Sequence, residues 1–326
     1  MTDGWRPADY LAYRDAARGV LTRYEGMAAI RACGLDEVLG DAEPADDLTP
    51  AYAFLEAQGY RAAVTPALGI LGLAASAITA LTTAGPATLL ASPLGATDVV
   101  VVPGLLDSSA VAVDRLGTGL VTVPRSAVTV RAEPEPVADG YLSVVDIDLA
   151  AGRTLIPEEE MNGWRLSMLG RTRLGAAAEM IGVIDRILED AIGYARQRVQ
   201  FGRPVSGFQA MQHLLAWAAT ERHQAICLFD LAVARSAHGP ADPALIRAVK
   251  AMAGRVLHTI VQAATQATGA ISFTWEYSLN RLHRRGLGLD LIAGASADLV
   301  AEMGREIRVL GSAPGLIDLS DVAPRS

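Results

Sequence analysis

The spacing of hydrophobic positions changes twice along the chain. From about residue 156 onward, apolar residues return mostly at steps of three and four, the period of a helix with one buried stripe. The first such stripe comprises Leu166, Leu169, Ala177, Met180, Ile181, Ile184, Ile187, Leu188 and Ile192. Gly202 and Pro204 interrupt it, and a second apolar pattern runs from Leu214 to Phe229. So short a hinge predicts two long antiparallel helices of a bundle.

Local signals predict where these helices begin and end. Ser206 and Gln209 have capping-box spacing, which starts the second helix at the hinge. Asp242-Pro243 and Gly269 bracket a third long helix, with proline at its start and glycine after its end. A shorter helix is predicted over 277–285, and Ser296 caps a last one that ends near residue 311. We therefore expect a C-terminal four-helix bundle over residues 156–326.

Short β-branched segments separated by Gly, Pro, Asp and Ser fill the middle of the chain, which predicts a reduced antiparallel β-domain over residues 96–155. They are 98–103, 110–113, 119–124, 126–131 and 141–148. Residues 1–95 are expected to be helical, with Thr49-Pro50 opening one helix. The predicted fold is mainly α with a small β-domain: an N-terminal helical domain, the β-domain and the bundle.

Composition narrows the class of protein. The chain has 326 residues, 51% hydrophobic and 20% charged, with a net charge of −8, which argues against nucleic acid or an anionic membrane as partner. Residues 62–97 contain no charge, but their Gly, Pro and small residues favour a packed helix and loop over a membrane span. Two cysteines and no leader indicate a reduced, cytoplasmic protein. The histidine spacing predicts no metal site.

Two motifs carry a resemblance to a known family. Arg198-x-x-Phe201-Gly202-x-Pro204 is followed by Phe208-Gln209-x-x-Gln212, and residues 266–277 read QATGAISFTWEY. In this order and spacing they resemble the C-terminal segments of acyl-CoA dehydrogenases, from about residue 160 to 311. The resemblance implies a helical, β and helical domain order, FAD as the cofactor and an acyl-CoA thioester as the substrate.

The resemblance assigns part of an FAD site to this chain. Arg198 matches an arginine that reaches the FAD pyrophosphate of a neighbouring subunit, and a planar guanidinium suits two phosphate oxygens. Phe201, Gln209, Gln266 and Gly269 match other residues of that cofactor site. Taken singly, Arg198 is better explained as a solvated helix-end charge, Gln209 as a capping residue and Gly269 as a helix C-cap. Taken together, in the family's order, these residues favour the FAD contact.

Other parts that the family requires lack a counterpart. No tryptophan lies between Arg6 and Asn162, and residues 91–98 match the family's flavin-ring loop only weakly. The two positions where relatives carry the catalytic glutamate are occupied by Ala293 and Thr172, and neither side chain is a general base. Arg173 matches an arginine near the bound acyl-CoA, which makes it the candidate substrate-binding residue.

The chain has counterparts for the residues that reach the FAD of a neighbouring subunit, but none for the catalytic base. This pattern favours a subunit of a heteromeric acyl-CoA dehydrogenase in lipid metabolism. Such a subunit shares a flavin with a complete subunit and has no base of its own. One alternative is a non-enzymatic helical scaffold, derived from such an enzyme, that binds no flavin. Another is a homo-oligomeric flavoenzyme with a displaced base at Asp290, Glu276 or Glu179. Asp290 is otherwise expected to pair with Arg284 or Arg285. The acyl substrate and the partner are not specified by the sequence.

Overall fold

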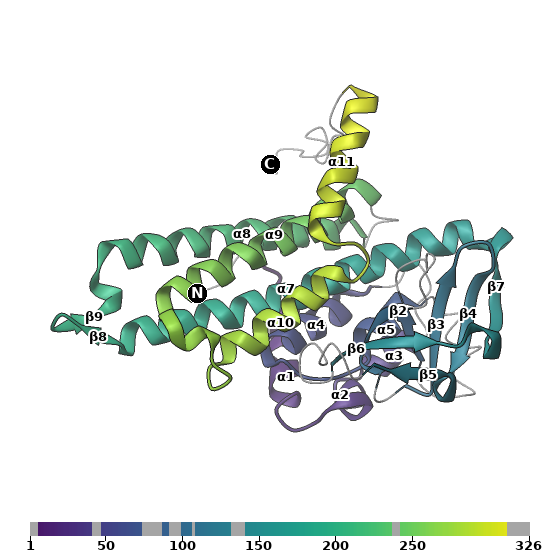
Figure 1. Ribbon diagram of the computed structural model, residues 1–326, viewed down its shortest axis with the longest axis horizontal. Helices are drawn as coiled ribbons and strands as arrows, with labels where there is room; N and C mark the ends of the chain where they lie inside the picture. The colour runs from purple at the N-terminus through teal and green to yellow at the C-terminus, as the bar shows by residue number, and fades with distance from the viewer. Residues whose placement is uncertain are drawn as a thin grey trace.

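The structure is a computed structural model of the whole chain. It describes residues 6–40, 47–73, 87–90, 99–105, 108–131, 141–236 and 242–311. In Figure 1 a long helical bundle lies beside a small group of strands, and shorter N-terminal helices pack along the bundle. The loop predicted at 91–98, and most of the uncharged stretch 62–97, lie outside the described residues.

Among the residues that the structure describes, the N-terminal part has the helices α1 (Ala8–Val20), α2 (Gly26–Ala32), α3 (Leu35–Gly40), α4 (Thr49–Arg61) and α5 (Ala67–Gly72). Helix α4 begins at the predicted Thr49-Pro50, but Thr49 is its first helical residue and Leu48, not Thr49, is its N-cap. The Thr49 amide donates to the Asp47 carboxylate at 2.9 Å. No helix in the described parts of the chain has the length and apolar content that a bilayer crossing requires.

In the described part of the middle region, seven strands form two small sheets, and their pairings are antiparallel except one. The strands are β1 (Ala87–Leu90), β2 (Val99–Pro103), β3 (Ala110–Arg115), β4 (Gly119–Pro124), β5 (Val128–Val130), β6 (Leu142–Ile147) and β7 (Arg153–Pro157). Their orders are β1-β3-β4-β7 and β2-β6-β5, and β1 runs parallel to β3. A valine-rich core that includes Val111, Val123 and Val145 lies between them.

Strands β1 and β7 were not predicted. The hydrophobic pattern of Ala87–Leu90 covers too few residues to distinguish a strand from the helical region predicted before it. Strand β7 has Arg153 and Pro157 at its two ends, which weakens its strand pattern. Strand β1 therefore lies inside the range expected to be helical. The division into domains at residues 95 and 155 stays a prediction.

The C-terminal part consists of α7 (Met161–Gln197), α8 (Gln209–Ser236), α9 (Pro243–Thr268), α10 (Ser278–Leu291) and α11 (Ser296–Leu310). The small hairpin of β8 (Val199–Gln200) and β9 (Arg203–Pro204) joins α7 to α8. Figure 1 shows α7, α8, α9 and α10 side by side, with α11 projecting from them. The predicted mainly helical fold with small antiparallel sheets is confirmed.

Helix α7 is the centre of the molecule and is buried around its whole circumference between Leu174 and Ile184, not along a single stripe. Leu166, predicted in that stripe, is 63% exposed. Two glycines allow α4 and α7 to touch backbone to backbone. A Cβ at Gly182 would overlap the Glu56 carbonyl, and one at Gly59 would overlap the Glu179 carbonyl.

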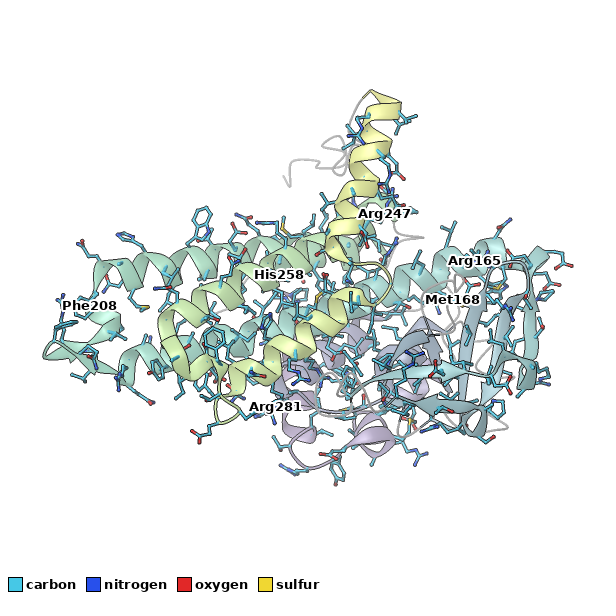
Figure 2. The ribbon with its side chains drawn as sticks, in the orientation of Figure 1. Arg165, Met168, Phe208, Arg247, His258 and Arg281 are labelled. Carbon is cyan, nitrogen blue, oxygen red and sulfur yellow. The ribbon has the colours of Figure 1, made fainter. Side chains whose placement is uncertain are left out.

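Two arginines fasten the ends of the bundle to their neighbours, and both are labelled in Figure 2. Arg165, near the start of α7, donates to Asp114 of β3 at 2.7 and 2.8 Å and to Glu158 at 3.0 and 3.1 Å. Arg247 of α9 pairs with Glu302 at 2.9 Å and Glu306 at 2.5 Å on α11. The bundle is thereby joined to the sheet at one end, and α11 is joined to α9.

Candidate functional site

The first candidate site lies at the end of the bundle where α7 and α9 finish and α8 begins (Figure 1). Arg198 is the residue at which α7 ends, because its backbone turns to an extended conformation with ψ of 118°. Its amide still donates to the Tyr194 carbonyl at 2.9 Å, and its own carbonyl accepts from Val205 at 2.8 Å. The backbone is therefore fixed, while the guanidinium points outward and is exposed.

The hairpin between β8 and β9 presents an aromatic side chain to solvent. Phe201 is 92% exposed and has a φ of +50°, a left-handed conformation that side chains other than glycine rarely adopt. Its ring meets the ring of Phe208 edge-on with centroids 6.3 Å apart, and the Arg203 guanidinium lies 4.0 Å from the Phe208 centroid. These contacts hold the hairpin against Phe208, while most of the Phe201 ring stays exposed to solvent.

Gln209 is exposed as the first residue of α8. The predicted capping box is wrong, since the helix begins three residues after Ser206. The Ser206 carbonyl accepts instead from the side chain of Gln212 at 3.1 Å. Without the cap, the Gln209 amide has no partner among the residues that the structure describes.

The end of α9 completes this surface. Gln266 is exposed in its last turn, and Gly269 follows the helix with a φ of +69°. A Cβ at Gly269 would meet nothing within 4 Å, so its backbone is open to an approaching group. Tyr277, just beyond, donates to the Asp190 carbonyl at 3.2 Å, and its ring lies 6.0 Å from Tyr194. Because Tyr277 directly precedes α10, these contacts hold the start of α10 beside the last turns of α7.

We call Arg198, Phe201, Gln209, Gln266 and Gly269 the bundle-end surface. It combines a free guanidinium, a flat aromatic ring, two amide side chains and open glycine backbone. In the described residues no carboxylate pairs with Arg198. Such a set fits the pyrophosphate and adenine of a dinucleotide, because a guanidinium binds phosphate oxygens in pairs and a π-face stacks on a base.

The second candidate site is the turn between α10 and α11, which contains Ala293, one of the two positions that lack a glutamate. Ala293 is buried there with a φ of +60°, and its carbonyl accepts a hydrogen bond from Arg173 of α7 at 3.0 Å. Thr172, next to Arg173, is buried and donates to the Met168 carbonyl at 2.8 Å. Burial lowers the pKa of Arg173 below its ordinary value. Neither position supplies a group that could accept a proton from carbon.

Lys250 of α9 holds the same turn from the other side, and the sequence alone did not identify it. Its buried ammonium donates to the Asp290 carbonyl at 2.9 Å and to the Gly294 carbonyl at 3.3 Å, and lies 3.4 Å from the Asp290 carboxylate. Asp290 also accepts from the Ser296 hydroxyl at 2.9 Å. The expected pairing of Asp290 with Arg284 or Arg285 is therefore wrong, because the carboxylate is turned toward α9 and the start of α11.

Glu179 is buried completely in a polar network at the junction of α4, α7 and α10. It accepts from Arg285 at 2.5 and 2.9 Å, from the Tyr141 hydroxyl at 2.7 Å and from Gln58 at 3.1 Å. Burial raises the pKa of Tyr141 well above its ordinary value, and the nearby negative charge of Glu179 raises it further. The Tyr141 hydroxyl therefore stays protonated and donates. These donors occupy the acceptor positions of both carboxylate oxygens, so Glu179 has a structural role and no free lone pair for a proton. Glu276 is exposed, outside this network.

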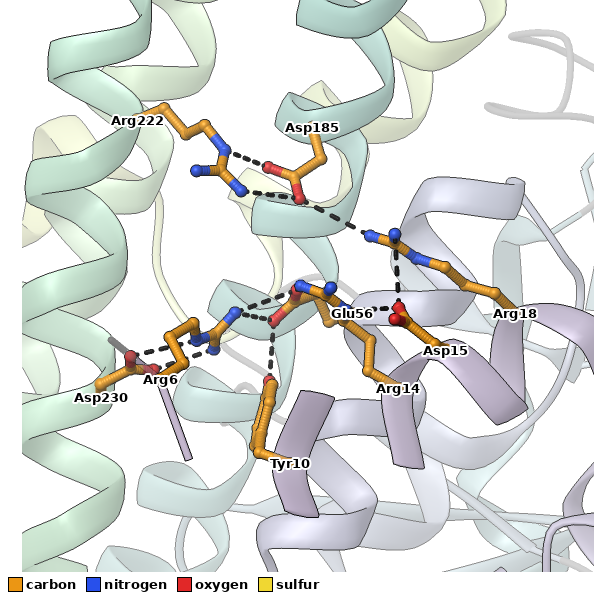
Figure 3. A network of polar contacts seen from close by, with 9 residues as sticks. All are labelled: Arg6, Tyr10, Arg14, Asp15, Arg18, Glu56, Asp185, Arg222 and Asp230. Carbon is orange, nitrogen blue, oxygen red and sulfur yellow. Dashed lines mark hydrogen bonds and ion pairs between the residues drawn. The ribbon is translucent and has the colours of Figure 1, made fainter. Parts of the chain in front are cut away.

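A separate buried network joins the N-terminal helices to the bundle (Figure 3). Glu56 of α4 accepts from Arg6 at 2.9 and 3.1 Å, from Arg14 at 3.0 Å and from the Tyr10 hydroxyl at 2.8 Å. Arg6 also binds Asp230 of α8 at 2.9 Å. Burial alone would raise the pKa of Glu56, but Arg6 and Arg14 reverse this effect and lower it. This network is structural, because all its members are paired with one another.

No cluster of three or more His, Cys, Asp or Glu side chains suited to a metal ion occurs in the described ranges.

Comparison with known proteins gives three results for the sequence. The family model described as "Acyl-CoA dehydrogenase, C-terminal domain" matches residues 162–307. Acyl-CoA dehydrogenase IpdE2 of Mycobacterium tuberculosis is 30% identical over 131 residues, 40% of each chain. Its namesake from Mycolicibacterium smegmatis is 26% identical over 179 residues, 55% of this chain and 54% of the relative. The alignments thus span about half or less of these relatives.

The fold has many counterparts among solved structures. A chain of the ChsE4-ChsE5 complex from Mycobacterium tuberculosis superimposes with a TM-score of 0.73 and 18% sequence identity. The superposition covers 93% of this chain and 98% of that one. At this identity the match establishes a shared fold that extends beyond the helical bundle to the N-terminal and β regions.

Proposed function

Because the chain belongs to the acyl-CoA dehydrogenase family, we propose that it is one subunit of a heteromeric acyl-CoA dehydrogenase and contributes half of an FAD site. The other subunit, a complete acyl-CoA dehydrogenase, supplies the remainder of the site and the catalytic carboxylate. FAD, when bound, accepts the hydride from the β-carbon of the acyl thioester. The residues of this chain bind and orient the cofactor.

One contrast carries this proposal. The residues suited to a dinucleotide are exposed together at the bundle end, whereas the turn where a base belongs has the Ala293 methyl group and a carbonyl held by Arg173. An exposed cation, an exposed ring and open glycine backbone can reach across to a neighbouring subunit. A catalytic base must lie beside its own substrate and cannot be replaced by distant residues.

Each residue of the bundle-end surface has a proposed role. Arg198 would bind the pyrophosphate with its planar fork, and Phe201 would lie against the adenine. Gln209 and Gln266 would donate hydrogen bonds from their amides, and the open backbone at Gly269 would let the cofactor approach closely. Arg173, at the other site, would contact the acyl-CoA. The match with a chain from a two-component complex supports the heteromeric arrangement.

Retention of flavin by the complex with and without Arg198 tests the proposal. A charge-assisted hydrogen bond contributes about 1.5–3 kcal/mol, so Arg198→Ala should weaken flavin retention roughly ten- to a hundredfold. Arg198→Lys should restore only part of it, since an ammonium keeps the charge and loses the fork. Flavin absorbance after gel filtration of the purified complex measures the effect.

Arg196→Ala is the matched control, because Arg196 is exposed on the last turn of the same helix. It should leave flavin content unchanged. The apo chain should unfold at the same temperature in all three variants, since an exposed helix-end charge contributes little to stability. Unchanged flavin content together with destabilised Arg198→Ala apo protein would instead favour a helical scaffold that binds no flavin.

A further inference from the structure

The segment between α9 and α10 projects from the bundle as a loop and presents a tryptophan to solvent (Figure 1). It comprises the 3-10 turn η6 (Gly269–Phe273) and residues 274–277. Trp275 is 69% exposed, and its indole nitrogen has no acceptor among the residues that the structure describes. The loop therefore offers a large apolar ring and a free hydrogen-bond donor.

Hydrogen bonds on both sides of Trp275 fix the backbone of this loop. The hydroxyl and the amide of Thr274 both donate to the Ile271 carbonyl, at 2.8 and 3.1 Å. Three residues after Trp275, the Ser278 hydroxyl donates to the Asp190 carboxylate of α7 at 2.5 Å. Because the loop is held in place before a partner binds, little conformational entropy is lost when Trp275 is covered.

Trp275 lies beside a positively charged part of α10. The Arg284 guanidinium is 5.1 Å from the indole ring centroid, and Arg281, labelled in Figure 2, is exposed one turn earlier on the same helix. Glu276 is the only acidic residue between positions 270 and 289. We call Trp275, Arg281 and Arg284 the tryptophan surface. Tryptophan and arginine are enriched among the residues that dominate binding at protein interfaces, so this surface suits a partner with an apolar pocket and acidic residues around it.

We propose that the complete acyl-CoA dehydrogenase subunit binds the tryptophan surface, with Trp275 inserted into a pocket of that subunit. This inference rests on the proposed function, in which the same subunit meets the bundle-end surface. Gly269 belongs to that surface and precedes Trp275 by six residues, which span at most about 20 Å. An interface that buries about 800 Å² on each partner is roughly 30 Å across. A subunit that meets Gly269 is therefore expected to cover Trp275 as well.

A second copy of this chain is a poorer occupant. In a two-fold contact through the tryptophan surface, Arg281 and Arg284 would approach the same arginines of the other copy, and like charges repel. The complete subunit is not restricted in this way, because it can carry acidic residues opposite these arginines. The charges thus favour a different subunit at this surface.

Calorimetric titration of the two purified subunits in saturating FAD tests the inference. The partner used is the acyl-CoA dehydrogenase that co-purifies with the tagged chain from its native host and is identified by its mass. We expect Trp275→Ala to weaken binding about thirtyfold, and Trp275→Phe to weaken it less, because an aromatic ring is kept. Tyr24→Ala is the matched control, since Tyr24 is an aromatic residue between α1 and α2 and 47% exposed, and it should bind as the wild type does.

Two further measurements separate a contact with the partner from other roles of the loop. Arg281→Glu should slow association and reduce its dependence on salt, as expected for a charge at the edge of an interface. The complex of Trp275→Ala, assembled at concentrations above its dissociation constant, should hold as much flavin as the wild-type complex. Loss of flavin from this assembled complex would mean that the indole contacts the cofactor, and it would overturn the inference.

Circular dichroism must show that each variant is folded, and Trp275→Phe supplies a second test if Trp275→Ala is not. Binding of Trp275→Ala within twofold of the wild type would overturn the inference and leave the proposed function standing. A homodimer of the isolated chain that Trp275→Ala dissociates would assign the tryptophan surface to a second copy and overturn the inference as well. If the wild-type chain captures no acyl-CoA dehydrogenase, the proposed function fails, and the inference fails with it.

Discussion

Lys250 is the only lysine among 28 basic residues, and its fully buried ammonium has three oxygen atoms around it. An arginine would not fit here, because the site is compact and calls for a point charge. Burial lowers the pKa of Lys250 to about 8, although Asp290 acts in the opposite direction. The unfolded chain should have the ordinary pKa of about 10.4.

This difference predicts how stability depends on pH. Between about pH 8 and 10.4 the unfolded chain binds a proton that the folded chain has released, so the free energy of unfolding should rise with pH in that window. Relative to Lys250→Met, the wild type should gain about 1.6 kcal/mol between pH 8 and pH 9.5, since the folded-state pKa is about 8 and the unfolded one about 10.4. Urea unfolding of both proteins at the two pH values measures this gain.

Taking the difference between the two proteins removes the titration of tyrosines and cysteines, which both chains share. The same difference at both pH values would show that Lys250 stays charged in the folded protein throughout the window. Its three acceptors would then compensate fully for burial.

At the residue scale, the sequence did not indicate which side chains contact one another. Ala293 and Thr172 stay predicted positions of a missing base, and the structure adds that Arg173, next to Thr172, donates to the Ala293 carbonyl. It placed Asp290 beside Arg284 or Arg285, because residues close in sequence are the only neighbours that a sequence displays. The true partner, Lys250, is 40 residues away on another helix. Its isolation as a lone lysine was the only available signal.

At the scale of elements, the hairpin between α7 and α8 combines strain with exposure. Phe201 and Gly202 both have positive φ, as in the type I′ turns of two-residue hairpins, where Asn and Gly are the preferred residues. Phenylalanine at the first position is unfavourable, and strained residues of this kind cluster at functional sites. Phe201 is therefore expected to lower the stability of the chain relative to a residue that tolerates this conformation.

Phe201→Asn should accordingly have opposite effects on stability and on cofactor binding. The apo chain should gain about 0.5–1 kcal/mol in free energy of unfolding, because asparagine tolerates this backbone conformation. Flavin retention by the complex should fall, because the ring is lost. Thermal unfolding and flavin absorbance measure the two effects. Phe273→Asn is the control, since Phe273 is also exposed but has no positive φ.

Helix limits were predictable where proline or glycine sets them. Helix α9 begins at Pro243 and is followed by Gly269, and α11 ends before Gly311, all as expected. Prediction failed where tertiary contacts decide. Ser296 does not cap α11, because its hydroxyl binds Asp290. Helix α10 runs on to Leu291, beyond the predicted Arg285, because packing against α7 and α9 buries its second half.

At the scale of the whole molecule, the order of helices, strands and helices followed from the change of hydrophobic period. The position of α7 did not follow from it. A helix with neighbours on all sides needs apolar or small residues around its whole circumference. In the sequence, such a helix looks like one with a poorly defined hydrophobic stripe. The polar networks at Glu56 and Glu179 join three parts of the chain through residues up to 224 positions apart. No local pattern indicates such pairs.

If this chain binds the cofactor and the complete subunit supplies the base, changes in the two subunits should affect turnover by the assembled enzyme differently. If this chain provides no base, then Thr172→Val and Ala293→Gly should leave turnover by the complex within about threefold of wild type. Replacing the catalytic carboxylate of the complete subunit should lower turnover ~10²–10⁴-fold, the usual contribution of a well-placed general base. Steady-state assays of the reconstituted complex with an electron acceptor measure these rates.

The isolated chain should show no turnover in the same assay. Turnover by the homogeneous chain would mean that one of its own carboxylates removes the α-proton. Asp290 and Glu179 are poor candidates, because both are buried and already bound to cations and hydroxyl groups. Glu276 is exposed, so Glu276→Gln would be the first variant to test. Loss of that activity in Glu276→Gln would identify a self-sufficient flavoenzyme with a displaced base.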